Sequence, residues 1–242
     1  PIRHSLFGLL GNIYPKLDWA PKFLRAKTTF QALAMDSAQA YLHSVSVVPQ
    51  SLRRQLYSPR FSKSLQGYDS REVFEHHARR APTDDPLSLI QYLDMKTYLP
   101  GDILTKVDRA SMAHSLEVRA PMLDHVFMEW ASGLPPDLRL RGRQGKYIFK
   151  KSMEPYLPHD ILYRPKMGFS VPLAAWFRGP LRGRVRSSVL GDTLRATGMF
   201  QDQCLSRLVD EQQSGSVEHS SALWSLMMFE SFVRQNEDIG AA

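Results

Sequence analysis

Proline and glycine divide this chain into short segments, and within most segments the apolar residues recur at helical spacing. Between Thr28 and Ser44 the apolar side chains recur three to four positions apart, which is typical of an amphipathic helix. The chain lacks the long alternation of apolar and polar residues that is typical of strands. We therefore expect a mainly α-helical protein.

Several helix boundaries follow from capping residues. Asp85 can cap a helix that begins at Pro86, because proline lacks the N–H that would be unpaired there. This helix should run to about Leu99 and stop at Pro100 and Gly101. Further helices are expected at residues 102–115, 121–133, 145–156, 181–190, 201–214 and 216–236. The last of these is apolar nearly all round, which predicts a buried helix.

Length and composition suit one large domain or two small ones. The chain has 242 residues, of which 43% are hydrophobic, so it can bury a core without disulfides. Its single cysteine, Cys204, excludes an internal disulfide and fits the cytoplasm. The longest apolar stretch, residues 223–233, is too short to span a membrane. Because the chain opens on Pro1 rather than Met, we expect it to be a piece of a longer protein or to have had its ends trimmed.

The net charge of +7 leaves several kinds of partner open. Nucleic acid, an acidic substrate and a merely solvated basic surface are all compatible with it. The basic residues occur in small dispersed groups, such as Arg139, Arg141 and Arg143, and no zinc-finger spacing or RNA-binding aromatic motif accompanies them. A solvated surface without specific nucleic-acid binding is the better interpretation.

Charged residues cluster in two stretches, Tyr98–Asp124 and Gly145–Pro172, although their surroundings are largely apolar. Apolar segments exclude charges unless these are paired or used, so these stretches are where chemistry is expected. On a helix from Asp102, the side chains of Asp102, Lys106 and Arg109 share one face. From spacing alone, an ordinary solvated face with one ion pair is the better interpretation.

The segment from Ser115 to Pro121 should be extended, because a proline disfavours helical geometry in the residue before it. Glu117 and Arg119 then point to the same side, with Asp124 following, and Leu116, Val118 and Ala120 point to the other. A carboxylate held in this way can act as a general base or orient an amine. A purely structural ion pair is the alternative.

Lys166 lies in the sequence Arg-Pro-Lys-Met-Gly-Phe, which its proline and glycine mark as a loop. A lysine on such backbone is suited to stabilising developing charge on a phosphate, but from this segment alone an exposed loop lysine is the better interpretation. The histidines show no metal-ligand spacing, and no metal site is predicted.

The ordered motifs TKVDRASMAHSLEVRAPMLD, GKYIFKKSMEPYLP and RPKMGF resemble the C-terminal part of glutamine-hydrolysing asparagine synthetases. The likeness covers residues 1–242 as a single helical region, with its core motifs at 94–172. It is closest to the asparagine-synthetase-like amidotransferases of bacterial exosortase and exopolysaccharide gene clusters. The resemblance implies a multi-helical C-terminal region of an adenine-nucleotide α-hydrolase-like α/β domain, with the parallel sheet and pyrophosphate loop largely absent.

The family resemblance also implies an activity. In such enzymes a glutaminase domain releases ammonia, and a synthetase domain uses ATP and Mg²⁺ to adenylate a carboxylate before ammonia displaces AMP. This chain contains no SGG-x-D-S loop, so ATP and Mg²⁺ are expected in the full-length enzyme and not on this fragment. The missing glutaminase and ATP-loop regions are the expected partners, together with a small carboxylate acceptor and, as an open option, a second copy. A helical scaffold without catalysis is the alternative function.

Individual roles follow from the resemblance at five positions. Lys166 matches the lysine that stabilises phosphate charge, and Glu117 matches the acidic position that, in the related β-lactam synthetases, helps the catalytic base. Asp108, Arg109 and Arg119 match positions expected to shape the cleft near the acceptor.

Overall fold

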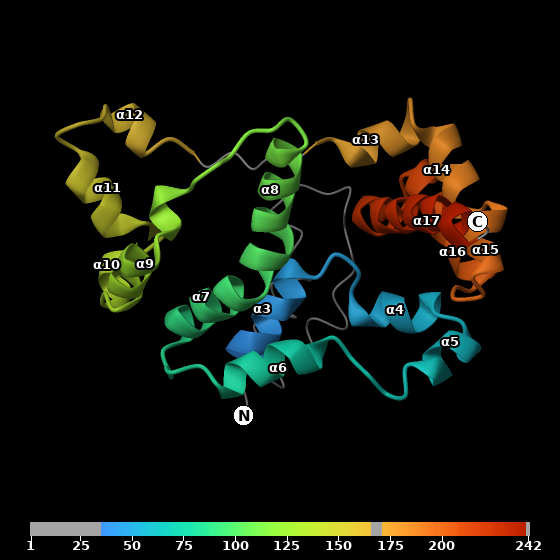
Figure 1. The fold of residues 1–242 in the computed structure, drawn as a ribbon, viewed down its shortest axis with the longest axis horizontal. Coiled ribbons are helices and arrows are strands. Elements are labelled where there is room, and N and C mark those ends of the chain that lie inside the picture. Colours follow the sequence, from blue (N-terminus) through green and yellow to red (C-terminus); the bar gives the residue numbers. More distant parts are fainter. Residues whose placement is uncertain (1–34, 166–170, 241–242) are drawn as a thin grey trace. The chain divides into compact units, whose positions relative to one another are not determined.

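The computed structural model describes residues 35–165 and 171–240, and these are mainly α-helical, as expected (Figure 1). Within this part of the chain the strands form one two-stranded antiparallel sheet. The chain divides into two compact units, residues 1–72 with 170–242, and residues 73–169. That the chain forms a single region of a larger domain stays a prediction. Among the described helices, none is both long and apolar enough to cross a membrane.

The first unit contains the helices of both chain ends. They are α3 (Ser37–Val45), α4 (Gln50–Leu56), α5 (Pro59–Ser64), α13 (Leu173–Arg178), α14 (Arg182–Val189), α15 (Asp192–Ala196), α16 (Asp202–Ser214) and α17 (Ser220–Gly240). The boundary between the units falls within α6 (Arg71–Arg79). The helix expected at residues 28–44 is described only from residue 35, where Asp36 caps α3 by accepting the Gln39 N–H.

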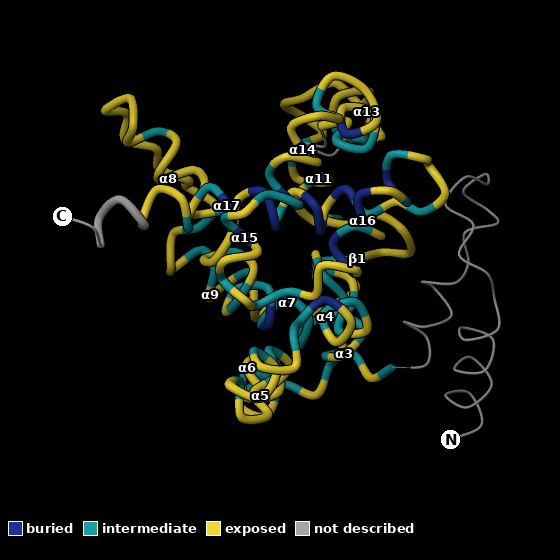
Figure 2. Tube along the Cα trace, turned by 90° about the vertical axis from the view of Figure 1, so that its right-hand side faces the viewer, coloured by how far each residue is buried: buried dark blue, intermediate teal, exposed yellow. Residues whose placement is uncertain are grey.

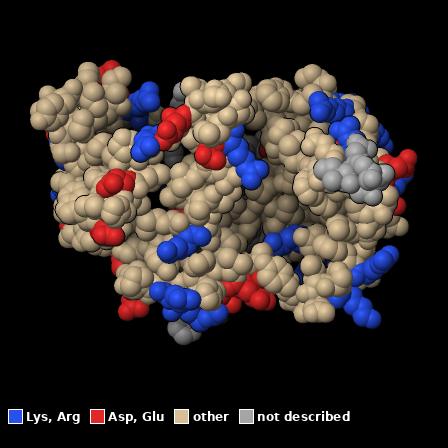
Figure 3. All heavy atoms as spheres, viewed as in Figure 1, with Lys and Arg blue, Asp and Glu red and all other residues tan. Residues whose placement is uncertain are grey.

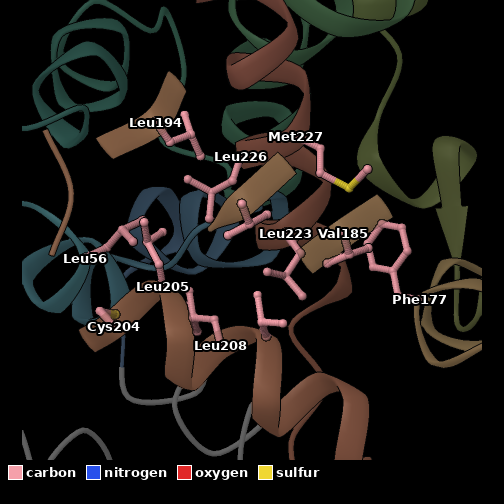
Figure 4. Close-up of a cluster of buried hydrophobic side chains, with 12 residues drawn as sticks. Leu56, Phe177, Val185, Leu194, Cys204, Leu205, Leu208, Leu223, Leu226 and Met227 are labelled. Carbon is pink, nitrogen blue, oxygen red and sulfur yellow. The ribbon is translucent and has the colours of Figure 1, made fainter. Parts of the chain in front are cut away.

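A hydrophobic core joins α13, α14, α15, α16 and α17 of the first unit (Figure 4). The side chains of Phe177, Val185, Leu208 and Leu223 within it are completely buried. Figure 2 shows that buried positions concentrate on these helices, whereas α8 and α9 are largely exposed. Burying a side chain of this size stabilises a fold by about 1.5–3 kcal/mol, so the stability of the first unit rests on this cluster.

Segments far apart in the sequence are tied together beside this core. The Ser58 N–H donates to the carbonyl of Met199 over 2.8 Å, and the Gln201 N–H donates to the carbonyl of Leu56 over 2.8 Å. Leu56 also enters the hydrophobic core from α4. These bonds hold the α4–α5 region on the C-terminal helices.

The long C-terminal helix differs from the buried helix that its composition predicts. Leu223, Leu226 and Met227 are buried, but Trp224, Met228 and Phe232 are 41, 43 and 61% exposed. Because residues four apart lie on one helix face, the exposed three form a stripe beside the buried one. Apolar composition predicted burial of the whole helix, whereas in the described part of the chain only one face has a packing partner.

The second unit contains shorter elements. They are α7 (Pro86–Lys96), a π-helical turn η2 (Leu99–Leu104), α8 (Thr105–Met112), a 3₁₀ turn η3 (Pro121–Leu123), α9 (His125–Ser132), α10 (Pro136–Arg139), β1 (Leu140–Arg141), β2 (Gln144–Gly145), α11 (Tyr147–Met153) and α12 (His159–Leu162). The Asp85 carboxylate accepts the Ser88 N–H over 2.8 Å and Pro86 is the first helical residue, which confirms the predicted start of α7.

The predicted helix stop at Pro100 and Gly101 is wrong. The chain stays helical there in the wider π geometry of η2 and then continues directly into α8. The Gly101 N–H donates to the Thr97 carbonyl over 3.0 Å, and the Thr105 hydroxyl donates to the Pro100 carbonyl over 2.8 Å. These bonds hold the helical path around the proline, and the axis bends between α7 and α8 (Figure 1).

Two glycines of the first unit should respond oppositely to alanine. A Cβ at Gly191 would lie 2.4 Å from the Ser187 carbonyl oxygen, whereas a Cβ at Gly183 in α14 would meet nothing within 4 Å. We expect Gly191→Ala to lower the free energy of unfolding by about 1–3 kcal/mol, because the backbone must shift. Gly183→Ala should raise it by about 0.4–1 kcal/mol, since the unfolded chain loses freedom. Urea unfolding measures both, and equal effects would contradict the packing at Gly191.

Candidate functional site

A left-handed residue turns the chain from α8 into the predicted extended segment. Ser115 has φ +57°, the Leu116 N–H donates to the Ser111 carbonyl over 3.0 Å, and the Ser115 N–H donates to the Met112 carbonyl over 3.0 Å. This pair of bonds is the Schellman arrangement, in which glycine normally takes the left-handed position. α8 ends at Met112, earlier than the predicted end at about Ser115. Ser115 is a non-glycine residue in a strained conformation, and it lies two positions before Glu117.

Glu117 and Arg119 form the ion pair that an extended backbone predicts. Arg119 Nη2 lies 2.6 Å and Arg119 Nε 2.8 Å from the same carboxylate oxygen, Glu117 Oε1. No hydrogen bond from the described residues reaches Glu117 Oε2. The two side chains are 70 and 86% exposed, so solvent weakens the attraction and the pair adds little stability. In this structure the pair places Glu117 Oε1 against the Arg119 guanidinium.

Asp124 does not join this pair. Its Oδ1 accepts the N–H groups of Val126 and Phe127 over 3.1 and 3.2 Å, which makes it the N-cap of α9. The helix predicted at residues 121–133 is therefore split, because η3 precedes this cap. Asp124 is explained by helix capping, and the carboxylate available for chemistry in this segment is that of Glu117.

Asp108 and Arg109 lie on α8, exposed to solvent. No ion pair or hydrogen bond links their side chains to another described residue. The neighbouring pair, Lys106 Nζ to Asp102 Oδ2, spans 3.9 Å and is half-exposed, as an ordinary solvated face predicts. Asp102 also raises the pKa of Tyr98, first of all by accepting a hydrogen bond from its hydroxyl.

Lys166 lies outside the described residues, so its distance from Glu117 stays untested. The chain just before it carries a charged cluster that the sequence analysis missed. Glu154 Oε1 accepts the Tyr163 hydroxyl over 2.6 Å and lies 2.9 Å from Lys151 Nζ. The hydrogen bond from Tyr163, followed by that from Lys151, lowers the pKa of Glu154. The Lys150 ammonium stands 5.5 Å from the Tyr163 ring centroid. Glu154 and Tyr163 are nine positions apart, and no sequence pattern predicts a contact at that spacing.

Arg139 is also misassigned by the sequence, which placed it in a solvated basic group. Its side chain is 11% exposed, and its guanidinium donates to Gln91 Oε1 over 2.5 Å and to the Ser88 hydroxyl over 2.6 Å. Both acceptors belong to α7, so Arg139 fastens α10 to that helix. The ends of α7 and α10 are 40 residues and more apart in sequence, which hides this contact from any local pattern.

The asparagine synthase family model matches residues 9–234. The chain belongs to the asparagine synthase family. A putative glutamine-hydrolysing asparagine synthetase of Mycobacterium tuberculosis strain H37Rv is 36% identical over 145 residues, which are 60% of this chain and 22% of that protein. Asparagine synthetase 1 of Bacillus subtilis is 27% identical over 212 residues, 86% of this chain and 32% of that protein. No solved structure matches the chain.

The chain thus spans less than a third of the length of these relatives. Another relative, the amidase chyE of Penicillium rubens, is 29% identical over 141 residues, 55% of this chain and 20% of that protein. The family match confirms the predicted resemblance at the level of the asparagine synthase family.

Membership of the asparagine synthase family implies the use of ATP. Among them, no group of three or more His, Cys, Asp and Glu side chains could hold a metal ion. The strands here have two residues each and are followed by no glycine-rich phosphate loop. A cavity of about 460 Å³ lies in the first unit between α4, α16 and α17, and no predicted site residue lines it. The described residues therefore do not fit Mg²⁺–ATP.

The strain at Ser115 gives a stability prediction. We expect Ser115→Gly to raise the free energy of unfolding by up to about 1 kcal/mol, because glycine adopts positive φ without a Cβ clash. Ser152→Gly in α11 is the matched control, and it should lower the free energy by about 0.5 kcal/mol. Urea unfolding measures the free energy of unfolding of both variants. If Ser115→Gly lowers it as much as Ser152→Gly does, the left-handed turn at Ser115 is ruled out.

The cluster before Lys166 gives a titration prediction. Removing the Tyr163 hydroxyl in Tyr163→Phe should raise the pKa of Glu154 toward its ordinary value, because the main group stabilising the carboxylate is lost. Carboxyl ¹³C NMR titration of Glu154 measures the change. Tyr156→Phe removes a hydroxyl from a tyrosine that is 77% exposed and should leave this titration unchanged. An unchanged Glu154 titration in Tyr163→Phe would contradict the hydrogen bond.

Proposed function

We propose that this chain is the C-terminal part of the synthetase domain of an ATP-dependent, glutamine-hydrolysing amidotransferase. In the proposed reaction, an oxygen of the acceptor carboxylate attacks the α-phosphorus of ATP and pyrophosphate leaves. Ammonia then attacks the acyl carbon, the bond to AMP breaks, and the nitrogen loses a proton. The product is an amide. The names of the relatives and the family match support this class of reaction.

The observation that carries the proposal is the Glu117–Arg119 pair. Both Arg119 contacts are to Oε1 of the Glu117 carboxylate, which is largely exposed. In the proposal, the other oxygen, Oε2, is accessible to a substrate amine. A carboxylate in a set orientation can take a proton from an attacking nitrogen or align it. In this proposal Glu117 assists the base, and Arg119 is its positioning residue.

The remaining residues have supporting roles in the proposal. Lys166 stabilises negative charge on the phosphate during adenylation, and Asp108 and Arg109 shape the acceptor side of the cleft. The free side chains of Asp108 and Arg109 within the described chain are compatible with substrate contact. ATP and Mg²⁺ are bound by regions of the full-length enzyme outside this chain.

We further propose the subgroup and the setting of the enzyme. In this proposal the acceptor is a small carboxylate. The likeness to exosortase-cluster amidotransferases extends the candidate acceptors from aspartate to sugar acids. The single cysteine and the need for ATP suit the cytoplasm. Basic and acidic side chains are interspersed on the face drawn in Figure 3, so this face carries no continuous basic patch of the kind that nucleic acid binds.

The catalytic proposal is tested in the complete polypeptide encoded by the gene. With ammonium as nitrogen donor and aspartate or glucuronate as acceptor, Glu117→Gln should lower kcat for AMP formation about 100-fold, because the carboxylate that assists the base is lost. Lys166→Met should lower ATP–pyrophosphate exchange about 100-fold. Asp102→Asn, in the solvated Asp102–Lys106 pair, is the control and should stay within about twofold of the parent.

The same assay separates the catalytic function from the scaffold alternative. Residues 1–242 alone should show no ATP–pyrophosphate exchange, and exchange by them would contradict the assignment of the ATP site to other regions. If the complete polypeptide forms no AMP with any carboxylate while still binding a protein partner, the helical scaffold is the correct function. Equal activity of Glu117→Gln and the parent would remove Glu117 from the mechanism.

A further inference from the structure

The second unit buries almost no apolar side chain of its own. Among its described residues, Leu93 is the one apolar side chain in the buried class, and every other buried apolar residue lies in the first unit. Meanwhile Val126, Trp130 and Tyr156 are 62, 59 and 77% exposed. A stretch of this length normally buries a core, so a surface of this kind marks a face that another polypeptide covers.

The exposure is most continuous around the proposed site. Residues 112–122 are all exposed, and within them Leu116 and Val118 are 60 and 56% exposed. Residues 116–120 lie outside any helix or strand, and Ala120 has extended φ and ψ. The Glu117–Arg119 contact joins side chains two positions apart, so in an extended segment Leu116, Val118 and Ala120 would lie on the opposite side. This alternation is typical of a strand with one side packed and the other free.

The backbone of this segment also lacks the partners of a strand. Among the described residues, no backbone hydrogen bond uses the N–H or C=O groups of residues 117–119. An exposed apolar strand with unpaired backbone groups is a template for pairing with another strand, and proteins cover such edges. Pro121 limits the paired length, because it has no N–H to donate.

We infer that residues 116–120 bind an extended strand from the region of the synthetase polypeptide that lies outside these 242 residues. Main-chain hydrogen bonds to residues 117–119 would form the pairing, and apolar side chains of that region would cover Leu116 and Val118. The relatives supply the length for such a region, since the match covers only 22 and 32% of their chains. The inference rests on the proposed function and adds how its site is completed, because this pairing would hold Glu117 on a rigid strand.

Amide hydrogen exchange tests the pairing. In the complete polypeptide encoded by the gene, amides among residues 117–119 should exchange at least about 100-fold more slowly than in residues 1–242 alone, because paired N–H groups are protected. Val118→Lys should abolish this protection. Val171→Lys is the matched control, since Val171 is 55% exposed but belongs to the first unit, and it should leave the protection intact.

Any other result of the exchange experiment contradicts the proposed strand pairing. Equal exchange in the two proteins excludes a strand from outside the 242 residues. Protection in residues 1–242 that grows with concentration identifies a second copy as the partner, and protection that needs anionic phosphatidylserine vesicles identifies a membrane. AMP formation in the same complete polypeptide distinguishes the two proposals: activity without protection refutes the strand alone, and protection without activity refutes the amidotransferase alone.

Discussion

Burial of apolar helix faces in the first unit is the interaction on which the described structure depends. Helices α13 to α17 share one core, and α4 reaches it through Leu56, so segments from both ends of the chain are stabilised together. Among the described residues of the second unit, Leu93 is the one fully buried apolar side chain. The elements of this unit are held by caps and by polar contacts such as that of Arg139 with α7, which contribute about 1 kcal/mol each and not a cooperative core.

The difference in apolar burial between the two units accounts for the exposure of the candidate site, which lies in the second unit. A carboxylate such as Glu117 is useful when it is accessible, and the segment that carries it is exposed along its whole length. The Schellman turn at Ser115 and the cap at Asp124 set the two ends of that segment, while the Arg119 guanidinium sets the direction of the carboxylate. Local backbone interactions therefore position the group, and a covering polypeptide would supply the rigidity that catalysis needs.

Much of the local structure could be predicted from sequence patterns. The cap at Asp85, the extended backbone before Pro121 and the Glu117–Arg119 pair all follow from interactions within a few residues. The predicted helix stop at Pro100 was wrong, because the π-helical turn η2 accommodates a proline without a backbone N–H. No short sequence motif predicts such a turn. Arg139 and Tyr163 were missed because their partners are set by how helices meet and not by spacing along the chain.

By itself, the sequence determined the helical class of this protein, its family and the residues that form its charged segment. Those follow from periodicity, capping chemistry and ordered motifs, all of which are local. Only the tertiary structure decided that one described face of α17 is exposed, that Arg139 is nearly buried, and that Leu93 is the one fully buried apolar side chain among the described residues of the second unit. Burial depends on which surfaces meet in three dimensions, and residues distant in sequence decide that.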